Sequence, residues 1–391
     1  MTIKIAHIAD THLGYRQYGL VEREKDFYDS FRIMIDDMLD KNVDCVLHSG
    51  DLFEQAKPPI EALLVAQECF EKLMENGIDV YVIAGNHDKI QKKGTVIPQR
   101  LYESEKFHIL TLNNPIIKIS SDIVLCGLPY FPKNLEDAVK DELYKIYEEV
   151  KNYPYKILML HGSISKYFDM ECEFELDAIP EGFDYYAMGH LHNRILNYDF
   201  KKGILSYPGS TEIKSKAEIS DYNKNKKGYS LVSIDNSLTV EKIDFKLERK
   251  FISKTIKYYE LDEKLNILEK KIKEEILTQT DKKPVLILTI EEGDFNRSDV
   301  SKRVYEQLGD ITLNIRLTYK PTEEIMDGPI KKSIYSPEKV LEEVIDEEYE
   351  KDKKITRLGV DLYKELSIRN TEEAKRISDK FLEEYHSNKQ E

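Results

Sequence analysis

Short apolar runs alternate with longer stretches of helical spacing in the first part of the chain. The runs Ile3–Ala9, Cys45–His48 and Val80–Ile83 are predicted strands because each is short and mostly apolar. Between them, apolar residues recur at helical spacing in Phe27–Leu39, and residues 59–76 start with proline and are followed by glycine, so both segments are predicted helices. This alternation indicates a mainly parallel sheet covered by helices.

The pattern of short strands continues to residue 245, with one helix predicted near residues 135–150. The later strands alternate apolar and polar residues, which is typical of an antiparallel edge with one face in solvent. We therefore expect two packed sheets with helices outside. These predicted strands cover residues 109–112, 116–119, 123–127, 156–160, 185–188, 203–207, 229–234 and 238–245.

A separate unit is predicted to begin near Lys250. Its segments follow the order strand, helix, strand, helix, strand, which indicates a small two-layer α/β domain. After this unit the composition shifts towards charged residues of helical spacing. We therefore divide the chain into a body of residues 1–248, a small domain of residues 249–320, a linker of residues 321–336 and a helical segment of residues 337–391.

The helical segment carries apolar stripes among many charged residues, as in Val340, Leu341, Val344 and Ile345. Two or three short amphipathic helices without a further partner would bury such stripes poorly. Two interpretations stay open. The helices fold back on the body of the protein, or they lie in a groove of a partner protein.

Composition limits the class of protein. Of 391 residues, 41% are apolar and 34% charged, and the formal net charge is −15. This balance argues against a general nucleic-acid coat protein, but it leaves room for a local basic groove and suits cation binding. The four cysteines lack metal or redox spacing, so buried free thiols are expected. Without a signal-like start or an apolar run near ~20 residues, a soluble cytoplasmic protein with no membrane contact is expected.

Polar residues follow five of the predicted strands, at the ends where ligands gather in parallel sheets. Each motif alone is ordinary turn chemistry, but glycine beside most of them lets the backbone approach a ligand closely. Five such motifs at equivalent positions favour a shared metal site over five unrelated turns. The motifs are Asp10-Thr11-His12, Gly50-Asp51, Gly85-Asn86-His87-Asp88, His161-Gly162 and Gly189-His190-Leu191-His192. The other histidines are assigned to structural or surface positions, namely His7 and His48 within strands, His108 in a loop and His386 in the tail.

The candidate ligands are too numerous for one tetrahedral zinc ion. Imidazole, carboxylate and amide ligands in this number fit two ions that share one carboxylate, and they favour manganese, iron or zinc. Two ions about 3.5–4 Å apart form a clamp used in phosphate-ester hydrolysis. His87 is then placed to protonate the leaving oxygen or to contact the phosphoryl group, and Asp88 to orient a ligand. The predicted ligands are Asp10, His12, Asp51, Asn86, His161, His190 and His192.

These five motifs, in this order, resemble those of the calcineurin-like metallophosphoesterase superfamily. Longer stretches give a closer resemblance to double-strand-break repair nucleases of the meiotic-recombination-eleven or SbcD type. The stretches are HIADTHLGYRQYG, HSGDLFEQAKP, AGNHD, LMLHGSI, YYAMGHLHN and SYPGSTE. The small α/β unit resembles the capping domain of these nucleases, and the helical segment matches their partner-binding segment by pattern and position.

The resemblance implies a four-layer β-sandwich flanked by helices. It also implies a manganese-dependent nuclease, with 3′-to-5′ exonuclease activity on double-stranded DNA and endonuclease activity on single strands. Two Mn²⁺ ions per subunit would be bridged by Asp51, and His87 would be the catalytic group. One ion would be completed by Asp10, His12 and His192, and the other by Asn86, His161 and His190.

The resemblance further implies three kinds of partner. DNA ends, single strands and hairpins would be substrates, and the helical segment would bind the coiled-coil base of an ATPase of the Rad-fifty or SbcC type. Helices near residues 59–75 and 95–104 would form a homodimer interface. A basic rim could contact DNA, although each of its members, taken singly, is more often a solvated surface residue. The rim candidates are Tyr15, Arg16, Lys57, Lys89, Lys92 and Lys93.

One position departs from the family pattern. Many members carry a histidine three residues after the bridging aspartate, where this chain has Glu54. A carboxylate there would repel phosphate unless it is paired or bound to metal. The predicted metal ligands are unchanged, and Glu54 is expected to contact the site next to them. The departure puts in doubt the exonuclease efficiency, or the balance of exonuclease and endonuclease activity. Two alternatives stay open: a phosphoesterase for small phosphodiesters or cyclic nucleotides, and a catalytically inactive scaffold, which the complete ligand set disfavours.

Overall fold

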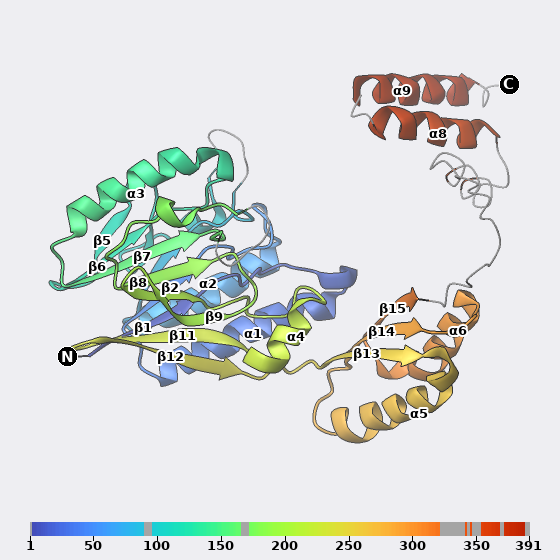
Figure 1. Cartoon of the computed structure of the whole chain (residues 1–391), viewed down its shortest axis with the longest axis horizontal. Coiled ribbons are helices and arrows are strands. Elements are labelled where there is room, and N and C mark those ends of the chain that lie inside the picture. The colour runs from blue at the N-terminus through green and yellow to red at the C-terminus, as the bar shows by residue number, and fades with distance from the viewer. Residues whose placement is uncertain are drawn as a thin grey trace. The chain divides into compact units, whose positions relative to one another are not determined.

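The computed structural model describes residues 2–89, 96–165, 172–320, 353–367 and 371–387, together with Leu341 and Ile345. The chain forms two compact units, Met1–Thr322 and Glu323–Glu391 (Figure 1). The first unit contains three sheets, and the second contains helices α8 and α9. Within the described ranges, every helix is too short or too polar to cross a membrane.

The first sheet has six strands in the order β12-β11-β1-β2-β3-β4. Strands β1 to β4 pair in parallel, and β11 and β12 extend one edge in antiparallel pairing. The predicted parallel sheet with an antiparallel edge is therefore present. Its strands are β1 (Ile3–Ile8), β2 (Cys45–Ser49), β3 (Asp79–Ile83), β4 (Phe107–Ile109), β11 (Lys227–Ile234) and β12 (Leu238–Phe245).

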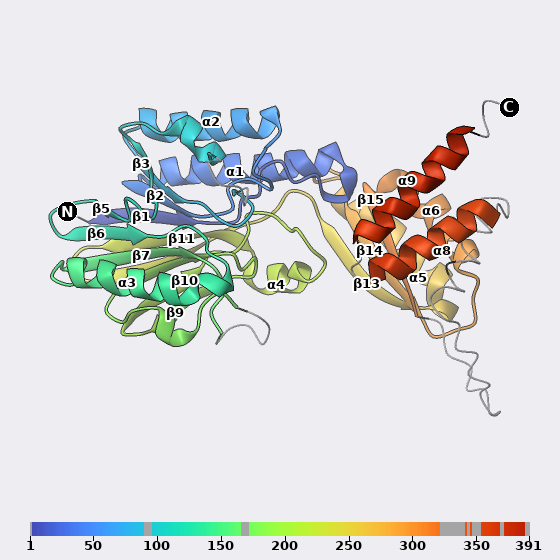
Figure 2. The ribbon, with the colours of Figure 1, turned by 90° about the horizontal axis from the view of Figure 1, so that it is seen from above.

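Helices α1 (Val21–Asp40) and α2 (Ile60–Glu75) cover the outer face of this sheet (Figure 2). Phe31 of α1 and Phe70 of α2 pack in the apolar layer beneath them. Helix α2 starts after a proline, and Gly77 adopts a φ of 83° just beyond its end, as the sequence predicted. Helix α1 starts at Val21, before the predicted start at Phe27. The prediction missed the first turns because they are charged and show no apolar stripe.

The second sheet has six strands in the order β5-β6-β7-β8-β10-β9. Helix α3 (Glu136–Val150) covers its outer face, where Leu143 and Ile146 pack against strand residues such as Leu158. The strands are β5 (Ile116–Lys118), β6 (Ile123–Gly127), β7 (Tyr155–His161), β8 (Tyr185–Gly189), β9 (Ile195–Phe200) and β10 (Gly203–Tyr207).

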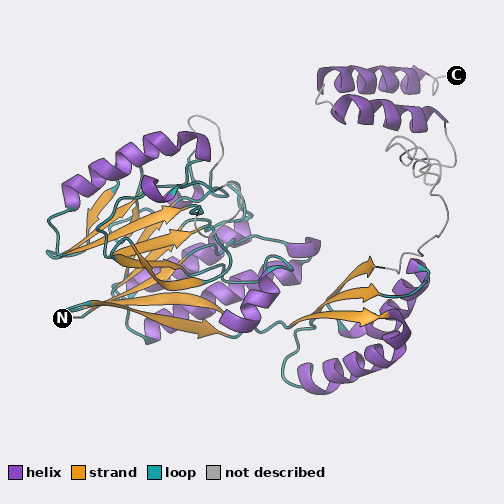
Figure 3. Ribbon diagram, viewed as in Figure 1, coloured by secondary structure: helices purple, strands orange, loops and turns teal. Residues whose placement is uncertain are grey.

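The inner faces of the two sheets pack against each other (Figure 3). Ile5 and Leu47 of the first sheet share this layer with Leu125 and Ile157 of the second, and all four are fully buried. Helix, sheet, sheet and helix thus form four layers, and the predicted fold class is confirmed. Parallel strands of both sheets can therefore present their carboxyl ends at one edge of the sandwich.

Short elements connect these layers. His108 lies in strand β4 rather than in the predicted loop, and its ring stacks on Tyr81. The four cysteines are buried free thiols, as predicted. The short elements are η1 (Gln17–Gly19), η2 (Pro98–Tyr102), η3 (Lys133–Leu135), η4 (Leu176–Ala178) and α4 (Glu218–Asn225).

The third sheet belongs to the small α/β unit and has three parallel strands in the order β13-β14-β15. Helices α5 and α6 pack on it through Leu265 and Val304. Asn296, rather than the predicted serine, caps α6 by accepting the backbone N–H of Ser298. Its elements are β13 (Phe251–Lys257), η5 (Tyr258–Glu260), α5 (Leu261–Lys271), η6 (Ile272–Ile276), β14 (Val285–Glu291), α6 (Arg297–Leu308), η7 (Gly309–Ile311) and β15 (Asn314–Lys320).

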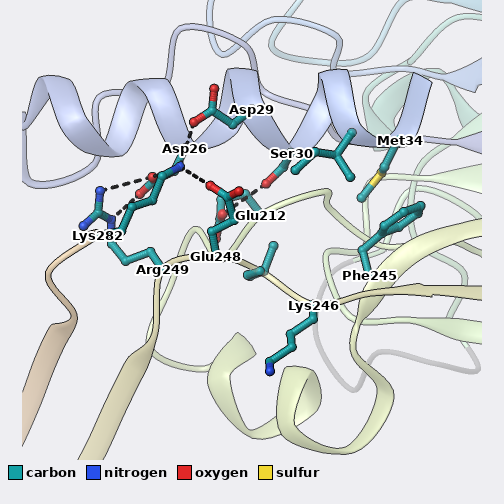
Figure 4. A pocket seen from close by; sticks show the side chains of 12 residues that line it. Asp26, Asp29, Ser30, Met34, Glu212, Phe245, Lys246, Glu248, Arg249 and Lys282 are labelled. Atoms are coloured by element: carbon teal, nitrogen blue, oxygen red, sulfur yellow. Dashed lines mark hydrogen bonds and ion pairs between the residues drawn. The ribbon is translucent and has the colours of Figure 1, made fainter. Parts of the chain in front are cut away.

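A cluster of charged side chains joins helix α1 to the start of the small α/β unit (Figure 4). Buried Asp26 accepts hydrogen bonds from Arg23 at 2.5 Å and from Arg249 Nε at 2.5 Å. Lys282 Nζ lies 3.3 Å from Asp26 and 2.7 Å from Asp29. These contacts tie the small unit to the body through charge as well as through apolar packing.

The second unit contains helices α8 (Lys353–Ser367) and α9 (Thr371–Ser387), which pack against each other. Val360 of α8 and Ala374 of α9 are buried. The predicted linker of residues 321–336 lies outside the described residues, as does most of the chain from 337 to 352.

Candidate metal centre

The carboxyl ends of five strands meet at one edge of the sandwich. In the first sheet, Asp10 and His12 follow β1, Asp51 follows β2 and Asn86 follows β3. In the second sheet, β7 ends at His161, and His190 and His192 follow β8. All seven predicted ligands are brought together by this arrangement, as the contacts below describe.

The first group of side chains surrounds His12. Its Nε2 atom lies 3.1 Å from Nε2 of His192, 3.9 Å from Oδ1 of Asp10 and 3.8 Å from Oδ2 of Asp51. Ligand atoms of Asp10, His12 and His192 all lie within 4.8 Å of one another. This group contains two imidazoles and two carboxylates.

The second group surrounds His161. Its Nε2 atom lies 3.3 Å from Oδ2 of Asp51 and 3.0 Å from Oδ1 of Asn86. Nδ1 of His190 lies 3.1 Å from the same Asn86 oxygen. Oδ2 of Asp51 lies 3.8 Å from Nε2 of His12 and 3.3 Å from Nε2 of His161, so one carboxylate oxygen is close to both groups, as a shared ligand requires.

The hydrogen-bond partners of the ring nitrogens favour a cation in this cluster. Nδ1 of His161 donates to the Ser49 carbonyl at 2.7 Å, so its Nε2 faces the oxygens of Asp51 and Asn86. Nδ1 of His12 and Nδ1 of His192 each contact a glutamate, and their two Nε2 atoms face each other at 3.1 Å. Acceptor atoms that converge in this way repel one another unless a proton or a cation lies between them. The residues present therefore fit divalent cations.

The backbone of the site is held in conformations that side chains rarely adopt. Asp10, His12, Asp51 and His190 have φ values of 54°, 46°, 55° and 98°. Such strain persists only where surrounding structure fixes it, and it is common at functional sites. It turns these side chains towards the same point.

Glycine beside the ligands leaves room for them. A Cβ atom on Gly85 would lie 2.1 Å from Oδ1 of Asp51, and one on Gly189 would lie 2.0 Å from the Ser49 carbonyl oxygen. Both distances are far shorter than van der Waals contact. The glycines of the predicted motifs are therefore required by close packing around Asp51 and Ser49.

Burial and neighbouring charge set the protonation of the site. Burial lowers the pKa of His12 to about 3 and, with the charge of His161, that of His190 to about 4, so both rings are neutral at pH 7 and able to bind metal. Burial opposes charge on His161, but the carboxylates of Asp51 and Asp10 outweigh it and raise its pKa to about 9. Without a cation, His161 carries the compensating charge.

His87 and Asp88 hold different positions beside Asp51. The His87 backbone N–H donates to Oδ1 of Asp51 at 2.9 Å, and its Nδ1 donates to the Glu54 carbonyl at 2.7 Å. The His87 side chain is 34% exposed, so Nε2 is the ring nitrogen that remains for a substrate. Buried Asp88 accepts backbone N–H groups of Gly85, Leu52 and Phe53, which fixes the turn that carries Asn86 and His87.

The predicted basic rim is only partly available. Arg16 pairs with Glu24 at 2.6 Å, and Tyr15 packs edge-on against Phe27. Lys89 donates to the Tyr130 carbonyl at 2.8 Å and lies over the Phe131 ring, and burial lowers its pKa to about 8. Lys57 is exposed. Lys92 and Lys93 lie outside the described residues.

Several contacts of the ligands were absent from the sequence analysis. Lys214 contacts Glu54 at 2.8 Å, Glu218 contacts His192 Nδ1 at 3.2 Å, and Glu173 lies 3.7 Å from His190 Nε2. Lys227 pairs with Glu218 at 2.7 Å. These residues follow no strand-end motif. Their nearness to SYPGSTE, in the case of Lys214 and Glu218, was the one available signal.

Comparison with known proteins agrees with this geometry. The family described as calcineurin-like phosphoesterase matches residues 3–194. A DNA double-strand break repair protein Mre11 of Methanocaldococcus jannaschii is 45% identical over 255 residues, which cover 64% of this chain and 69% of that protein.

Two further relatives carry the same name. Mre11 of Methanococcus maripaludis is 33% identical over 398 residues, covering 98% of this chain and 100% of that protein. Mre11 of Sulfolobus acidocaldarius is 30% identical over 376 residues, covering 89% of this chain and 96% of that protein. The similarity therefore extends well beyond the metal centre.

Proposed function

Because the chain belongs to the Mre11 family of calcineurin-like phosphoesterases, we propose that it is a two-metal DNA nuclease with Mn²⁺ as its cofactor. The single observation that carries this proposal is the convergence of seven ligand side chains around the shared Asp51 carboxylate. Exonuclease activity on double-stranded ends and endonuclease activity on single strands are the proposed reactions.

Each ion has a defined set of proposed ligands. Asp10, His12 and His192 would hold one ion, and Asn86, His161 and His190 the other, with Asp51 shared. Their mixture of imidazole, carboxylate and amide donors suits Mn²⁺ better than Ca²⁺ or a thiolate-bound metal. When bound, the two ions would polarise water and offset the charge on the phosphate group.

Side chains of this protein would position the shared ligand Asp51 and supply a proton. His87 is fixed at Nδ1 by the Glu54 carbonyl, so Nε2 can carry a proton to the leaving oxygen or donate to the phosphoryl oxygen. The His87 backbone N–H donates to Oδ1 of Asp51 at 2.9 Å and so orients the carboxylate that the two ions would share. Buried Asp88 fixes the turn between them.

Three partners belong to the proposal. DNA would approach past exposed Lys57 and the half-exposed His87 side chain. A second copy of the chain would pack on the apolar surface formed by α2 and the segment around η2, where Ile60, Leu64, Val96 and Leu101 are exposed. A coiled-coil ATPase of the Rad-fifty type would bind the helices α8 and α9.

One experiment separates this function from hydrolysis of small phosphodiesters. Single-stranded circular DNA and a chromogenic phosphodiester would each be incubated with the protein and Mn²⁺, with a chelator as the metal-free control. We expect Mn²⁺-dependent DNA cleavage. Turnover of the small ester without cleavage of DNA would contradict the proposal.

The His87 side chain tests the catalytic assignment. His87→Leu is expected to reduce the rate of DNA cleavage by about 10²–10⁴-fold, the usual contribution of a positioned general acid. His108→Leu is a matched control, because His108 lies in β4 and stacks on Tyr81 away from the ligands. Wild-type cleavage by His87→Leu would refute the role of His87.

A further inference from the structure

Two histidines of one proposed ion site are held by similar pairs of side chains. His192 Nδ1 lies 3.2 Å from Oε1 of Glu218, and Oε2 of Glu218 accepts a hydrogen bond from Lys227 at 2.7 Å. His12 Nδ1 lies 2.9 Å from Oε2 of Glu54, which also accepts a hydrogen bond from Lys214 at 2.8 Å. Each histidine thus faces a glutamate, and each glutamate faces a lysine.

The hydrogen bond at Nδ1 determines what Nε2 can do. When Nδ1 of a neutral imidazole donates to a carboxylate, the proton resides on Nδ1 and Nε2 carries the lone pair that binds metal. The carboxylate also fixes the ring orientation and makes Nε2 more basic. Nε2 of His12 points at Asp10, Asp51 and His192, so the Glu54 contact directs it into the metal centre.

The two pairs differ in their exposure. Glu218 and Lys227 are 4% and 0% exposed, so they form part of the protein interior. Glu54 and Lys214 are 23% and 11% exposed and lie next to His87, whose Nδ1 donates to the Glu54 carbonyl. The partly exposed pair therefore lies beside the half-exposed side chain of His87, where the proposed substrate would bind.

We propose that Glu54 is a positioning residue that orients His12 towards one metal ion, and that Lys214 neutralises Glu54 so that it does not repel the phosphate groups of DNA. This inference rests on the proposed function. A carboxylate at position 54 is then compatible with an anionic substrate, because Lys214 Nζ lies 2.8 Å from it.

A competing hydrogen-bond arrangement makes the opposite assignment. Lys214 Nζ lies 3.1 Å from His12 Nδ1, so Lys214 rather than Glu54 could hold the ring. In that arrangement Nδ1 accepts a hydrogen bond from Lys214, Nε2 carries the ring hydrogen and metal binding at Nε2 is opposed. The two arrangements predict different effects of removing each side chain.

Metal binding distinguishes them. Mn²⁺ would be titrated into the full chain by isothermal titration calorimetry, for wild type, Glu54→Leu, Glu54→Gln and Lys214→Met. We expect Glu54→Leu to weaken one of the two ions by about 10–100-fold, the usual effect of removing such a partner. Glu54→Gln should weaken it less, because an amide oxygen still accepts a weaker hydrogen bond. Glu149→Leu, on the exposed face of α3, is the matched control.

Lys214→Met should act on DNA rather than on metal. With Lys214 absent, the Glu54 charge is unscreened, so we expect a several-fold higher KM for DNA, with Mn²⁺ affinity unchanged within about twofold. Lys216→Met, at an exposed lysine two residues along, is the control. Metal affinity that rises in Lys214→Met and is unchanged in Glu54→Leu would overturn the proposal and favour the competing arrangement.

The outcomes separate the positioning role from the proposed function. Failure of wild type to bind two Mn²⁺ ions or to cleave DNA would refute the function itself. Two ions bound with wild-type affinity by Glu54→Leu, in a chain whose wild type is active, would refute only the role of Glu54. Should Glu54→Leu not fold by circular dichroism, Glu54→Gln decides: a loss of about threefold or more supports the role, and unchanged affinity refutes it.

Discussion

Single residues at the metal centre are fixed by close packing as much as by chemistry. Asn86, His87 and Asp88 follow Gly85, and a side chain on Gly85 would overlap both the carboxylate and the backbone N of Asp51. Asp51 contacts both proposed ion sites. Gly85 therefore determines where Asp51, the ligand shared by both proposed ion sites, can lie.

Gly85→Ala tests this dependence. The added Cβ would lie 2.1 Å from Oδ1 of Asp51, so Asp51 must move and both ion sites are expected to lose their shared ligand. A shift of about 1 Å in a catalytic group costs about 100-fold in rate, so DNA cleavage in Mn²⁺ should fall by at least that factor. Gly309→Ala is the control, because its φ is −57° and its nearest neighbour is 3.9 Å away. Equal rates in both variants would show that Asp51 does not need this space.

Residues whose role follows from a strand end could be found from the sequence, and residues whose role follows from a side-chain contact could not. Asp10, Asp51 and His161 each follow or end a predicted strand, so the sheet brought them together as expected. Glu54 and Lys214 are separated by 160 residues, and their contact depends on side-chain geometry that no spacing rule encodes. Glu54 was expected to contact the site, but the cation that pairs with it was not identified.

At the scale of elements, apolar periodicity predicted most strands and helices, but it missed helix ends that are rich in charged residues. Helix α1 was predicted only from Phe27 because Arg23, Glu24 and Asp26 interrupt the apolar stripe. The structure buries all three through ion pairs and hydrogen bonds. Propensity rules treat such residues as solvent-facing, so the first turns of α1 could not be recognised.

Helix α2 and the η2 segment present one apolar surface. Tyr102 of η2 donates to the Leu63 carbonyl of α2 at 2.9 Å, so the two segments are joined. Ile60 and Leu64 of α2 are 75% and 55% exposed, and Leu101 of η2 is 69% exposed. Exposed apolar side chains of this kind are typical of protein interfaces, and they are the basis for the proposed dimer contact.

Leu64→Asp combined with Leu101→Asp is expected to convert a homodimer into a monomer, because two charges would be buried without partners in the interface. Sedimentation velocity measures the change. Leu112→Asp, at a similarly exposed leucine in the turn after β4, is the control and should leave the dimer intact. A wild-type chain that is monomeric at micromolar concentration would contradict the proposed interface.

Some apolar side chains of α8 remain exposed where α8 packs against α9. Val360 and Ala374 are buried, but Tyr363 and Leu366, which are i,i+3 neighbours on α8, are 37% and 53% exposed. Tyr363→Asp with Leu366→Asp should weaken binding to the coiled-coil ATPase by about 30-fold, which corresponds to the ~2 kcal/mol of an interface hot spot. Calorimetric titration of the full-length pair measures the loss, with Lys364→Ala as the control. Unchanged affinity would show that Tyr363 and Leu366 do not contact the ATPase.

At the scale of the whole first unit, one buried carboxylate links the body to the small α/β domain. Asp26 of α1 contacts Arg23 of the same helix. It also contacts Arg249 before β13 and Lys282 before β14 (Figure 4). Arg23 and Arg249 are 0% and 5% exposed. The guanidinium of Arg23 also lies 4.7 Å from the ring centre of Phe251 in β13. Buried Glu212 lies 3.3 Å from Arg23 and is its second carboxylate partner, whereas Asp26 is the carboxylate that Arg23, Arg249 and Lys282 share.

Asp26→Asn should destabilise the chain far more than a change at the neighbouring surface carboxylate. Removal of one partner leaves buried charge uncompensated, which costs about 3–5 kcal/mol. Asp29→Asn is the matched control: Asp29 also pairs with Lys282, at 2.7 Å, but is 40% exposed, so its loss should cost less than about 1 kcal/mol. Urea unfolding followed by circular dichroism would measure both variants.

A separate early transition in Asp26→Asn would indicate that the small domain loses its attachment before the body unfolds, because the cluster is the charged connection between them. Equal, small losses in the two variants would show that apolar packing alone holds the domains together.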